Sequence, residues 1–344
     1  TLIGSLWRAG GNGRLRQNSK GKKRSQEPDE GCKGNQRGWR SIGAFPAWPS
    51  CDRSGHRMFY GMPFMKLIRH GAAGAEKPGL VDAAGRHRDL SAHIDDLAGA
   101  ALSKASLAKL AAIDPESLPP VPEGTRLGAP VAGTRNFIAV GMNYADHAAE
   151  TGGTVPREPL LFSKAPNCIV GPNDDILIPP GATKLDWEVE LAIVIGETAW
   201  QVEEADAFDH IAGFVLCNDV SERAFQMEGT GQWLKGKSAP TFGPLGPWLV
   251  TPDEIADVQA LAMELDLNGA PRQRGNTATM VFGVRTLVSY VSRFVKLDPG
   301  DVITTGTPPG VGMGRKPPEF LAAGDVLRLT VEGLGEQRQK VAAY

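Results

Sequence analysis

Three acidic side chains alternate along the segment Asp186–Ile195, where Asp186, Glu188 and Glu190 precede an apolar run. In a β-strand alternate side chains share a face, so these carboxylates point one way and the residues between them point into a core. Carboxylates at the end of a buried strand repel one another and lose hydration, which is costly unless a cation or protons compensate. The pattern therefore predicts a metal site, with an exposed, solvated strand face as the alternative.

A second apolar run, residues 211–217, ends in Asn218 and Asp219. A carboxylate at the mouth of a buried strand is a natural third ligand beside Glu188 and Glu190. Three carboxylate oxygens are hard ligands and suit Mg²⁺ or Mn²⁺, with Ca²⁺ as a further option.

His147 and Glu150 lie three residues apart and would meet on one face if residues 143–150 form a helical turn. A carboxylate beside an imidazole fixes its tautomer and raises its basicity, and the pair could then take a proton from water. More often, a histidine and a glutamate at this spacing form an ion pair on the protein surface.

Cationic and amide side chains follow Asp219. Arg223 and Gln226 come four and seven residues later and would share a helix face with Asp219 if a helix begins there. Arg223 could hold a substrate carboxylate through two hydrogen bonds, or form a solvent-facing salt bridge. Lys237, expected in a glycine-containing loop, is either an electrostatic stabiliser or an exposed lysine.

A glycine-rich segment, residues 305–314, follows a predicted strand. It lacks the G-x-G-x-x-G spacing of a dinucleotide site, and the chain has no G-x-S-x-G or H-E-x-x-H motif, which argues against a serine hydrolase and a zincin. Its backbone N–H groups could still bind the anionic end of a substrate, with the Thr307 hydroxyl beside them.

Mostly short β-strands must position these residues. Runs of β-branched or aromatic residues predict strands at 137–140, 160–162, 188–195, 211–217, 261–267, 302–305 and 326–331. Asn268-Gly269 predicts a hairpin turn, and apolar residues at three- and four-residue steps predict one long helix over 279–294. Because strands and helices do not alternate regularly, we expect an α+β protein, mainly β, with mostly antiparallel rolled sheets.

Two further parts are predicted before residue 131. Residues 65–130 are expected to form a small N-terminal β domain with strands at 66–70, 79–82 and 86–89, a helix near 103–112 and a Pro-rich connector. Residues 131–344 are expected to form the catalytic domain.

Residues 1–64 hold 12 Lys/Arg and 4 Asp/Glu, against 25 Lys/Arg and 35 Asp/Glu in the remainder. We expect this basic, low-complexity extension to lie outside the fold, either disordered or as an upstream or vector-derived segment before a natural start at Met65. Nucleic-acid binding and a transit peptide are the alternatives for it.

The composition is that of a soluble globular protein, with 344 residues, 41% hydrophobic and 22% charged residues and a net charge of −2. No run of about 18 apolar residues occurs, so no membrane span is expected. Four cysteines without a C-x-x-C pair argue against a disulfide scaffold and a cysteine zinc site. They are typical of a reducing compartment, so we expect a cytoplasmic protein.

Six motifs, taken in chain order, resemble those of the fumarylacetoacetate hydrolase family. They are Gly141–Glu150 (GMNYADHAAE), Asp186–Leu191 (DWEVEL), Asn218–Arg223 (NDVSER), Lys237–Ser238, Thr241–Trp248 (TFGPLGPW) and Thr305–Gly312 (TGTPPGVG). The resemblance extends from about Met65 to the C-terminus. Each motif alone is not specific for the family, but all six in this order are. One departure is Pro240, which stands where many relatives carry an acid and leaves the geometry of that loop open.

This resemblance implies a mixed β-sandwich roll with a small N-terminal β domain, usually in a homodimer, and a divalent ion held by Glu188, Glu190 and Asp219. It also implies that His147 and Glu150 form the water-activating pair of hydrolytic members, with Lys237 facing the substrate as a further catalytic residue. The other substrate-binding positions that it implies are Tyr144, Arg223, Gln226 and Thr307.

The resemblance and these residues together imply a metal-dependent hydrolase that cleaves a C–C bond in a 2,4-dioxo acid, either an acylpyruvate or a 2,4-diketo-3-deoxy sugar acid. The metal would stabilise an enolate, and His147 with Glu150 would activate the water. A lyase, decarboxylase or isomerase acting on a related 2-oxo acid or on ureidoglycolate is the alternative, because the same metal site serves these reactions. A non-catalytic binding module is the remaining class.

Overall fold

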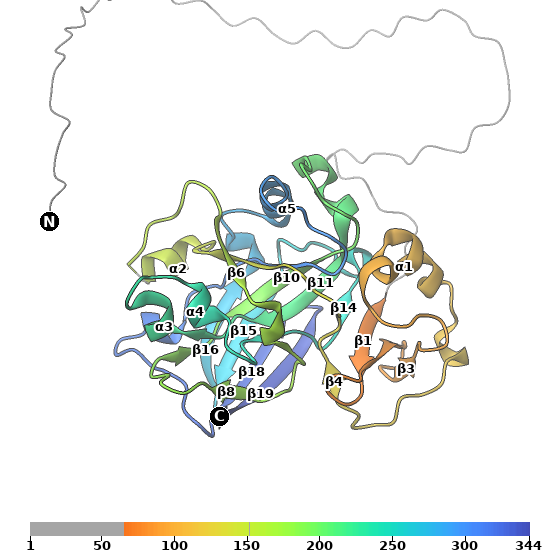
Figure 1. Ribbon diagram of the computed structural model, residues 1–344, viewed down its shortest axis with the longest axis horizontal. Helices are drawn as coiled ribbons and strands as arrows, with labels where there is room; N and C mark the ends of the chain where they lie inside the picture. The colour runs from red at the N-terminus through yellow and green to blue at the C-terminus, as the bar shows by residue number, and fades with distance from the viewer. Residues whose placement is uncertain (1–64, 151) are drawn as a thin grey trace, which may run out of the picture. The chain divides into compact units, whose positions relative to one another are not determined.

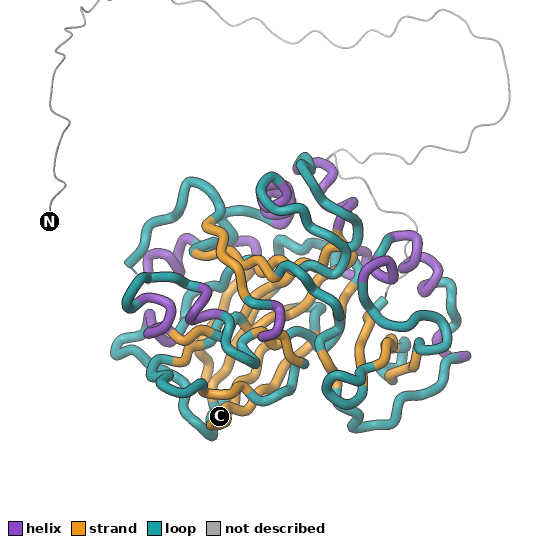
Figure 2. Tube along the Cα trace, in the orientation of Figure 1, coloured by secondary structure: helices purple, strands orange, loops and turns teal. Residues whose placement is uncertain are grey.

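The computed structural model describes residues 65–344 apart from residue 151, so the expectations for residues 1–64 lie outside the described residues. The described residues all belong to one compact unit. In its described part, strands fill the interior and short helices lie mostly at the periphery (Figures 1 and 2).

The larger sheet has ten strands in the order β3-β2-β1-β14-β11-β10-β17-β5-β6, with β4 also paired to β1. Its members are β1 (Lys66–His70), β2 (Lys77–Val81), β3 (His87–Asp89), β4 (Leu127–Gly128), β5 (Phe137–Gly141), β6 (Leu160–Lys164), β10 (Val189–Ile195), β11 (Ile211–Asn218), β14 (Leu249–Val250) and β17 (Val302–Thr304). The central strands β10, β11 and β17 are buried along their whole length, which explains their continuous apolar runs.

The second sheet has the strand order β16-β15-β18-β19-β8. Its members are β8 (Ile176–Ile178), β15 (Ala262–Leu267), β16 (Ala270–Asn276), β18 (Val326–Val331) and β19 (Gly335–Ala343). On β15 and β18 buried and more exposed residues alternate, because one face packs on the core and the other faces solvent. Strands β15 and β18 contact β10, and β18 and β19 contact β11, so the two sheets form a sandwich.

Two short strand pairs complete the β-structure, β7 (Ile169–Val170) with β13 (Gly243–Pro244) and β9 (Leu185–Asp186) with β12 (Ser221–Glu222). Most pairings are antiparallel, whereas β5–β17, β7–β13 and β8–β19 are parallel. The expected α+β, mainly β fold with mixed sheets is thereby confirmed.

The helices are short: α1 (Lys104–Ala111), α2 (Ala145–Glu150), α3 (Arg223–Met227), α4 (Leu234–Lys237) and α5 (Val284–Ser292). The long helix predicted over 279–294 is therefore wrong at both ends. Residues Thr277–Thr279 form a separate 3-10 turn that the Asn276 side chain caps, and Gly283 in extended conformation precedes α5. Phe294, which continues the apolar spacing, is 62% exposed. The spacing of apolar residues alone does not reveal that the helix begins only after Gly283.

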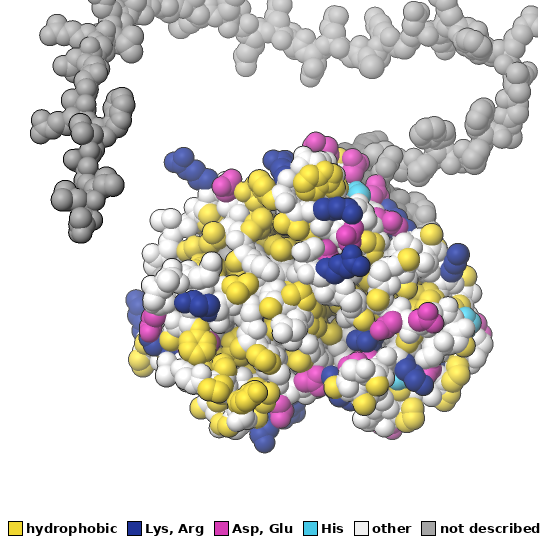
Figure 3. Space-filling model, viewed as in Figure 1, with side chains coloured by type: hydrophobic (Ala, Val, Ile, Leu, Met, Phe, Trp, Pro, Cys, Tyr) yellow, Lys and Arg dark blue, Asp and Glu magenta, His cyan; other side chains and the backbone are white. Residues whose placement is uncertain are grey.

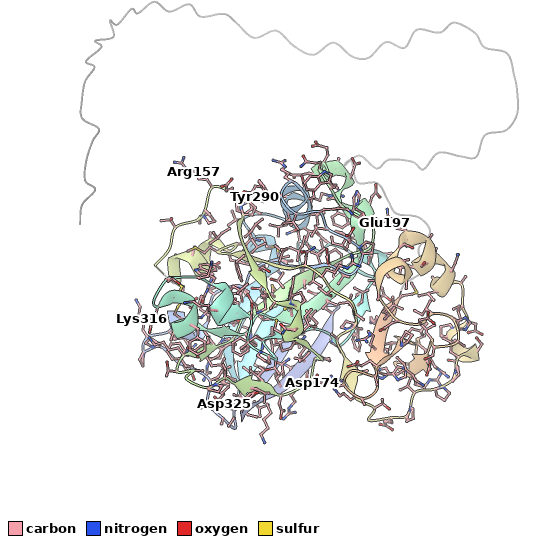
Figure 4. All side chains as sticks on the ribbon, viewed as in Figure 1. Arg157, Asp174, Glu197, Tyr290, Lys316 and Asp325 are labelled. Carbon is pink, nitrogen blue, oxygen red and sulfur yellow. The ribbon has the colours of Figure 1, made fainter. Side chains whose placement is uncertain are left out.

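Strand β1 joins the N-terminal strands to the rest of the larger sheet. Lys66 pairs with Val250 and Leu67 with Leu249, while β2 covers the other edge of β1. Arg126 adds a polar link, since its Nε donates to Asp174 Oδ1 at 2.7 Å, and Figure 4 places Asp174 near this junction. The boundary drawn at residue 130 remains a prediction.

Acidic and basic side chains are interspersed on the face shown in Figure 3, with hydrophobic side chains between them. Among the described residues, no helix is long and apolar enough to cross a membrane.

Candidate metal centre and active site

The pairing of two central strands brings the predicted ligands together. Val189 on β10 lies opposite Asn218 on β11, and just beyond this pair the Asp219 N–H donates to the Glu188 carbonyl at 2.9 Å. Glu188 and Asp219 therefore meet across the ends of two neighbouring antiparallel strands. Glu190 follows two residues later on β10, on the same face as Glu188.

Glu188, Glu190 and Asp219 each offer a carboxylate oxygen, and these oxygens all lie within 4.8 Å of one another. The side chains are buried, with exposed fractions of 5%, 1% and 1%. An all-oxygen, all-carboxylate donor set is the chemistry that hard divalent cations prefer. The donor set and its spacing thus fit an ion such as Mg²⁺ or Mn²⁺.

Three cationic side chains surround this triad. Lys237 Nζ lies 2.7 Å from both Glu188 Oε2 and Asp219 Oδ2, and Lys164 Nζ lies 2.6 Å from Asp219 Oδ1. Arg223 bridges two acids, with Nε 2.8 Å from Asp186 Oδ2 and its terminal nitrogen 2.6 Å from Glu188 Oε1.

Charge is not balanced within this cluster, because four carboxylates face three cations. The carboxylates belong to Asp186, Glu188, Glu190 and Asp219, and the cations to Lys164, Arg223 and Lys237. Burial opposes ionisation of Glu188, but Lys237 and Arg223 hold its pKa well below the usual range. Burial, together with the charges of Asp219 and Glu188, raises the pKa of Glu190 well above normal. Glu190 is thus the carboxylate that most requires a further cation or a proton.

The glycine-rich segment after β17 holds Glu190 through its backbone. The Gly306 N–H donates to Glu190 Oε2 at 2.9 Å, and the Thr305 N–H donates to the Leu191 carbonyl at 3.0 Å. Gly306 has a φ of +91°, and a Cβ there would lie 2.9 Å from Asn143 Cβ. The close approach to the segment before α2 therefore requires glycine at this position.

His147 and Glu150 do meet on one face of a helix, α2. His147 Nδ1 lies 3.4 Å from Glu150 Oε2, and Glu150 also accepts hydrogen bonds from the Gly310 N–H at 3.0 and 2.9 Å. Burial opposes ionisation of Glu150, yet its hydrogen bonds with His147 and Gly310 lower its pKa. Glu150 is therefore an anion that a second loop fixes beside the imidazole.

One cavity of 230 Å³ joins part of the triad to His147, whereas Asp219 and Glu150 do not line it. His147 from α2, Arg223 and Gln226 from α3, and Lys237 from α4 line it together with Glu188 and Glu190. Helices α3 and α4 are in contact, and in Figure 1 they lie near α2 beside the strands. Three short helices thus supply the polar side chains around a site that the strands anchor.

Two local expectations about these residues are wrong. Lys237 is the last residue of α4 and not part of a loop, and its side chain is buried. Asp219 does not share a helix face with Arg223, because α3 begins at Arg223 and the short strand β12 intervenes.

The predicted substrate-binding residues occupy different places. Arg223 and Gln226 line the cavity, and Gln226 Oε1 accepts from Arg223 at 3.0 Å. Thr307 also lines it, but its hydroxyl donates to the Val189 carbonyl at 2.9 Å and accepts from Gln273 at 2.8 Å. Tyr144 is fully buried outside the lining, with its hydroxyl 3.2 Å from the sulfur of Met263. The structure therefore does not bring Tyr144 to the cavity.

Lys164 and Gln273 are neighbours of the candidate site that sequence reasoning missed. Lys164 ends β6 and is completely buried, and Gln273 on β16 ties Thr307 to the β10 backbone through Val189. A lysine ending a short strand and a glutamine in a polar strand normally face solvent, so their residue types carried no signal.

Comparison with known proteins places the chain in a class of enzymes that includes hydrolases and isomerases. Residues 136–342 match the family model for the C-terminal domain of fumarylacetoacetate (FAA) hydrolase. The chain therefore belongs to the fumarylacetoacetate hydrolase family. A protein from Burkholderia cenocepacia, named only as a hydrolase, is 59% identical over 277 residues, which cover 80% of this chain and 98% of that protein.

Solved structures with the same fold include two with more specific names. A protein from Mycobacterium abscessus, named as a probable 2-hydroxyhepta-2,4-diene-1,7-dioate isomerase, has a TM-score of 0.69 and 33% identity, covering 81% of this chain and 99% of that one. Maleylpyruvate hydrolase from Sphingobium sp. SYK-6, solved with manganese(II) and pyruvate, has a TM-score of 0.68 and 26% identity, with the same coverage.

Proposed function

We propose that the protein is a divalent-metal-dependent hydrolase that cleaves 2,4-dioxo acids between C3 and C4, giving pyruvate and a carboxylic acid. The observation that carries this proposal is one cavity lined by Glu188 and Glu190 of the buried carboxylate triad and by His147, which pairs with Glu150. A cytoplasmic location and a homodimer are part of the same proposal.

Glu188, Glu190 and Asp219 would hold the ion, because their oxygens converge and the cluster lacks one positive charge. When bound, the ion would supply Lewis-acid stabilisation of negative charge at the 2-oxo acid end of the substrate. The manganese in the maleylpyruvate hydrolase structure supports Mn²⁺ or Mg²⁺ as the candidates.

His147 takes a proton from water while the water oxygen attacks the C4 carbonyl of the substrate. Glu150, held by the Gly310 N–H, fixes the orientation of the imidazole. The C3–C4 bond then breaks, its electron pair passes to C3, and the resulting pyruvate enolate takes a proton at C3. The acyl carbon keeps the water oxygen and leaves as the carboxylic acid, so one water is consumed, and ionisation of that acid then releases one proton.

The remaining cavity residues bind and orient the substrate. Arg223 and Gln226 face the site as donors for the substrate carboxylate, and Lys237 lies where negative charge develops. Thr307 acts through the loop that it fixes, because its hydroxyl hydrogen is engaged by the Val189 carbonyl.

An isomerase acting on a related 2-oxo acid is the second candidate, since a structural neighbour at 33% identity carries that name. Such a reaction would use the same acidic triad but release no pyruvate.

The test is pyruvate release from a panel of 2,4-dioxo acids, measured with lactate dehydrogenase. Exhaustive chelation should abolish release, and added Mg²⁺ or Mn²⁺ should restore it. Full activity in chelator would refute the metal requirement. Absence of pyruvate from every panel member would refute the hydrolase, and an absorbance change without pyruvate would favour the isomerase.

A further inference from the structure

Part of the cavity lining is apolar, and its side chains come from separate segments. We call it the apolar wall; its members are Met142, Phe162, Met227, Trp233 and Met313. Within this wall the Phe162 ring neighbours the charged residues, with its centroid 5.2 Å from Lys237 Nζ and 5.1 Å from the Trp233 ring centroid. The cavity lining therefore changes from charged to apolar at Phe162.

The apolar wall is held in place by backbone features. A Cβ at Gly141 would lie 2.7 Å from a Trp233 ring carbon, and a Cβ at Gly153 would lie 1.9 Å from the Met142 methyl carbon. Met142 itself adopts a φ of 55°, which non-glycine residues rarely do. A strained backbone that persists at a site indicates that the surrounding structure fixes it there. The positions of Met142 and Trp233 are thus built into the scaffold.

Acidic partners hold the arginine and the lysine of the cavity lining near the carboxylate triad, at the end where the 2-oxo acid group of the substrate would bind. Among the described residues that line the cavity, the lysines and arginines are Arg223 and Lys237. Arg223 contacts Asp186, Glu188 and Gln226, and Lys237 contacts Glu188 and Asp219. A second carboxylate on a substrate, placed against the apolar wall, would lose hydration without gaining a cation.

We infer that the apolar wall selects 2,4-dioxo acids whose chain beyond C4 is short, uncharged and apolar. This inference rests on the proposed function and adds the substrate class. The 230 Å³ volume lies below the range of about 300–1,000 Å³ typical of sites for drug-sized ligands, so it suits a short chain. An added hydroxyl is rejected only weakly by an apolar pocket, whereas a buried charge is rejected strongly.

A matched pair of substrates tests the selection. In 2,4-dioxoheptanoate and 2,4-dioxoheptanedioate the carbon chains have equal length, and a terminal methyl replaces a terminal carboxylate. Pyruvate release should give a kcat/KM at least about 10-fold higher for the monoacid, on the scale by which pockets discriminate.

Met227 offers the variant that should reverse this preference. It lines the cavity at the end of α3 and is 50% exposed, so arginine fits there without burial of its charge. Met227→Arg should lower the monoacid-to-diacid ratio of kcat/KM at least about 5-fold, since a new cation meets the terminal carboxylate. Leu234→Arg is the matched control, because Leu234 is 45% exposed on neighbouring α4 and does not line the cavity.

The outcomes separate this inference from the proposed function. Pyruvate release from both substrates with equal or better use of the diacid would overturn the apolar wall as a selector and leave the hydrolase standing. An equal change of the ratio in both arginine variants would overturn the local role of Met227 and with it the inference. Absence of pyruvate from every substrate would overturn the proposed function and this inference together.

Discussion

Glu190 is the acid whose charge the surrounding side chains leave uncompensated. Lys164, Lys237 and Arg223 contact the other carboxylates of the cluster, whereas Glu190 accepts a hydrogen bond from the Gly306 N–H. A buried carboxylate in this position destabilises the protein without a cation and becomes a strong ligand with one.

Replacement of this acid by its amide should therefore change two properties in opposite directions. Glu190→Gln should raise the melting temperature in chelator by about 2–4 °C, the shift that about 1 kcal/mol produces in a domain of this size. It should lower the Mn²⁺ affinity measured by isothermal titration calorimetry at least about 10-fold. Glu123→Gln, at an exposed position, is the control. A lower melting temperature in chelator would contradict the uncompensated charge.

His147 carries the second prediction at this scale. His147→Gln should reduce kcat for 2,4-dioxo acid hydrolysis at least about 10²-fold, because the variant keeps a polar side chain but loses the general base. Its Mn²⁺ affinity should stay close to that of the parent protein, which a merely structural role would not predict. His93→Gln, at an exposed position, serves as the control. Unchanged hydrolysis would mean that another group activates the water.

At the scale of elements, the strands were predictable because each is a short apolar run between turn residues. The predicted limits of β1 and β18 agree with the structure at both ends, and those of β10 and β11 within one residue. Helices α3 and α4 were not predicted as separate helices, because four or five residues are too few to show the repeat of apolar residues that marks a helix. The ligands Glu188, Glu190 and Asp219 could be predicted because they lie at the ends of two apolar runs in the sequence. The burial of Lys164 on β6 could not be predicted, because it depends on the tertiary fold and no local sequence pattern indicates it.

The N-terminal strands should respond to pH in the range where histidine titrates. Burial lowers the pKa of His70 on β1, with Asp89 opposing this and Lys77 and His87 adding to it. Burial likewise lowers the pKa of His87 on β3. The unfolded chain then binds protons that the folded chain does not, so stability is full above the unfolded pKa of about 6.5 and falls as the pH drops below it.

The measurement is urea unfolding at pH 8 and pH 5.5. Stability should be lower at pH 5.5, and the double variant His70→Asn with His87→Gln should show a clearly smaller difference between the two pH values. His93→Gln is again the control. An unchanged difference in the double variant would assign the pH dependence to other groups.

At the scale of the whole molecule, the described fold begins at Met65, whose N–H donates to the Thr251 hydroxyl at 3.2 Å. A chain that begins at Met65 should therefore keep its fold and its activity. We expect a melting temperature within about 2 °C of the full chain, the range of changes that do not touch the core. A loss of soluble protein or of pyruvate release on truncation would contradict the interpretation of residues 1–64 as an extension outside the fold.

The pairing of β1 with β14 also has a consequence for biosynthesis. Met65 and Thr251, which flank this pairing, are 186 positions apart. At a translation rate of about 5–20 residues per second, the ribosome needs about 10–40 s to make the partner after the first strand has been made. Strand β4 can pair with Arg69 and His70 earlier, but throughout that interval Lys66 and Leu67 lack their native partner strand. Unpaired strand edges of this kind can associate with other chains. Slower growth at low temperature or chaperone co-expression should therefore improve the yield of folded protein more than it would for a fold with local pairings.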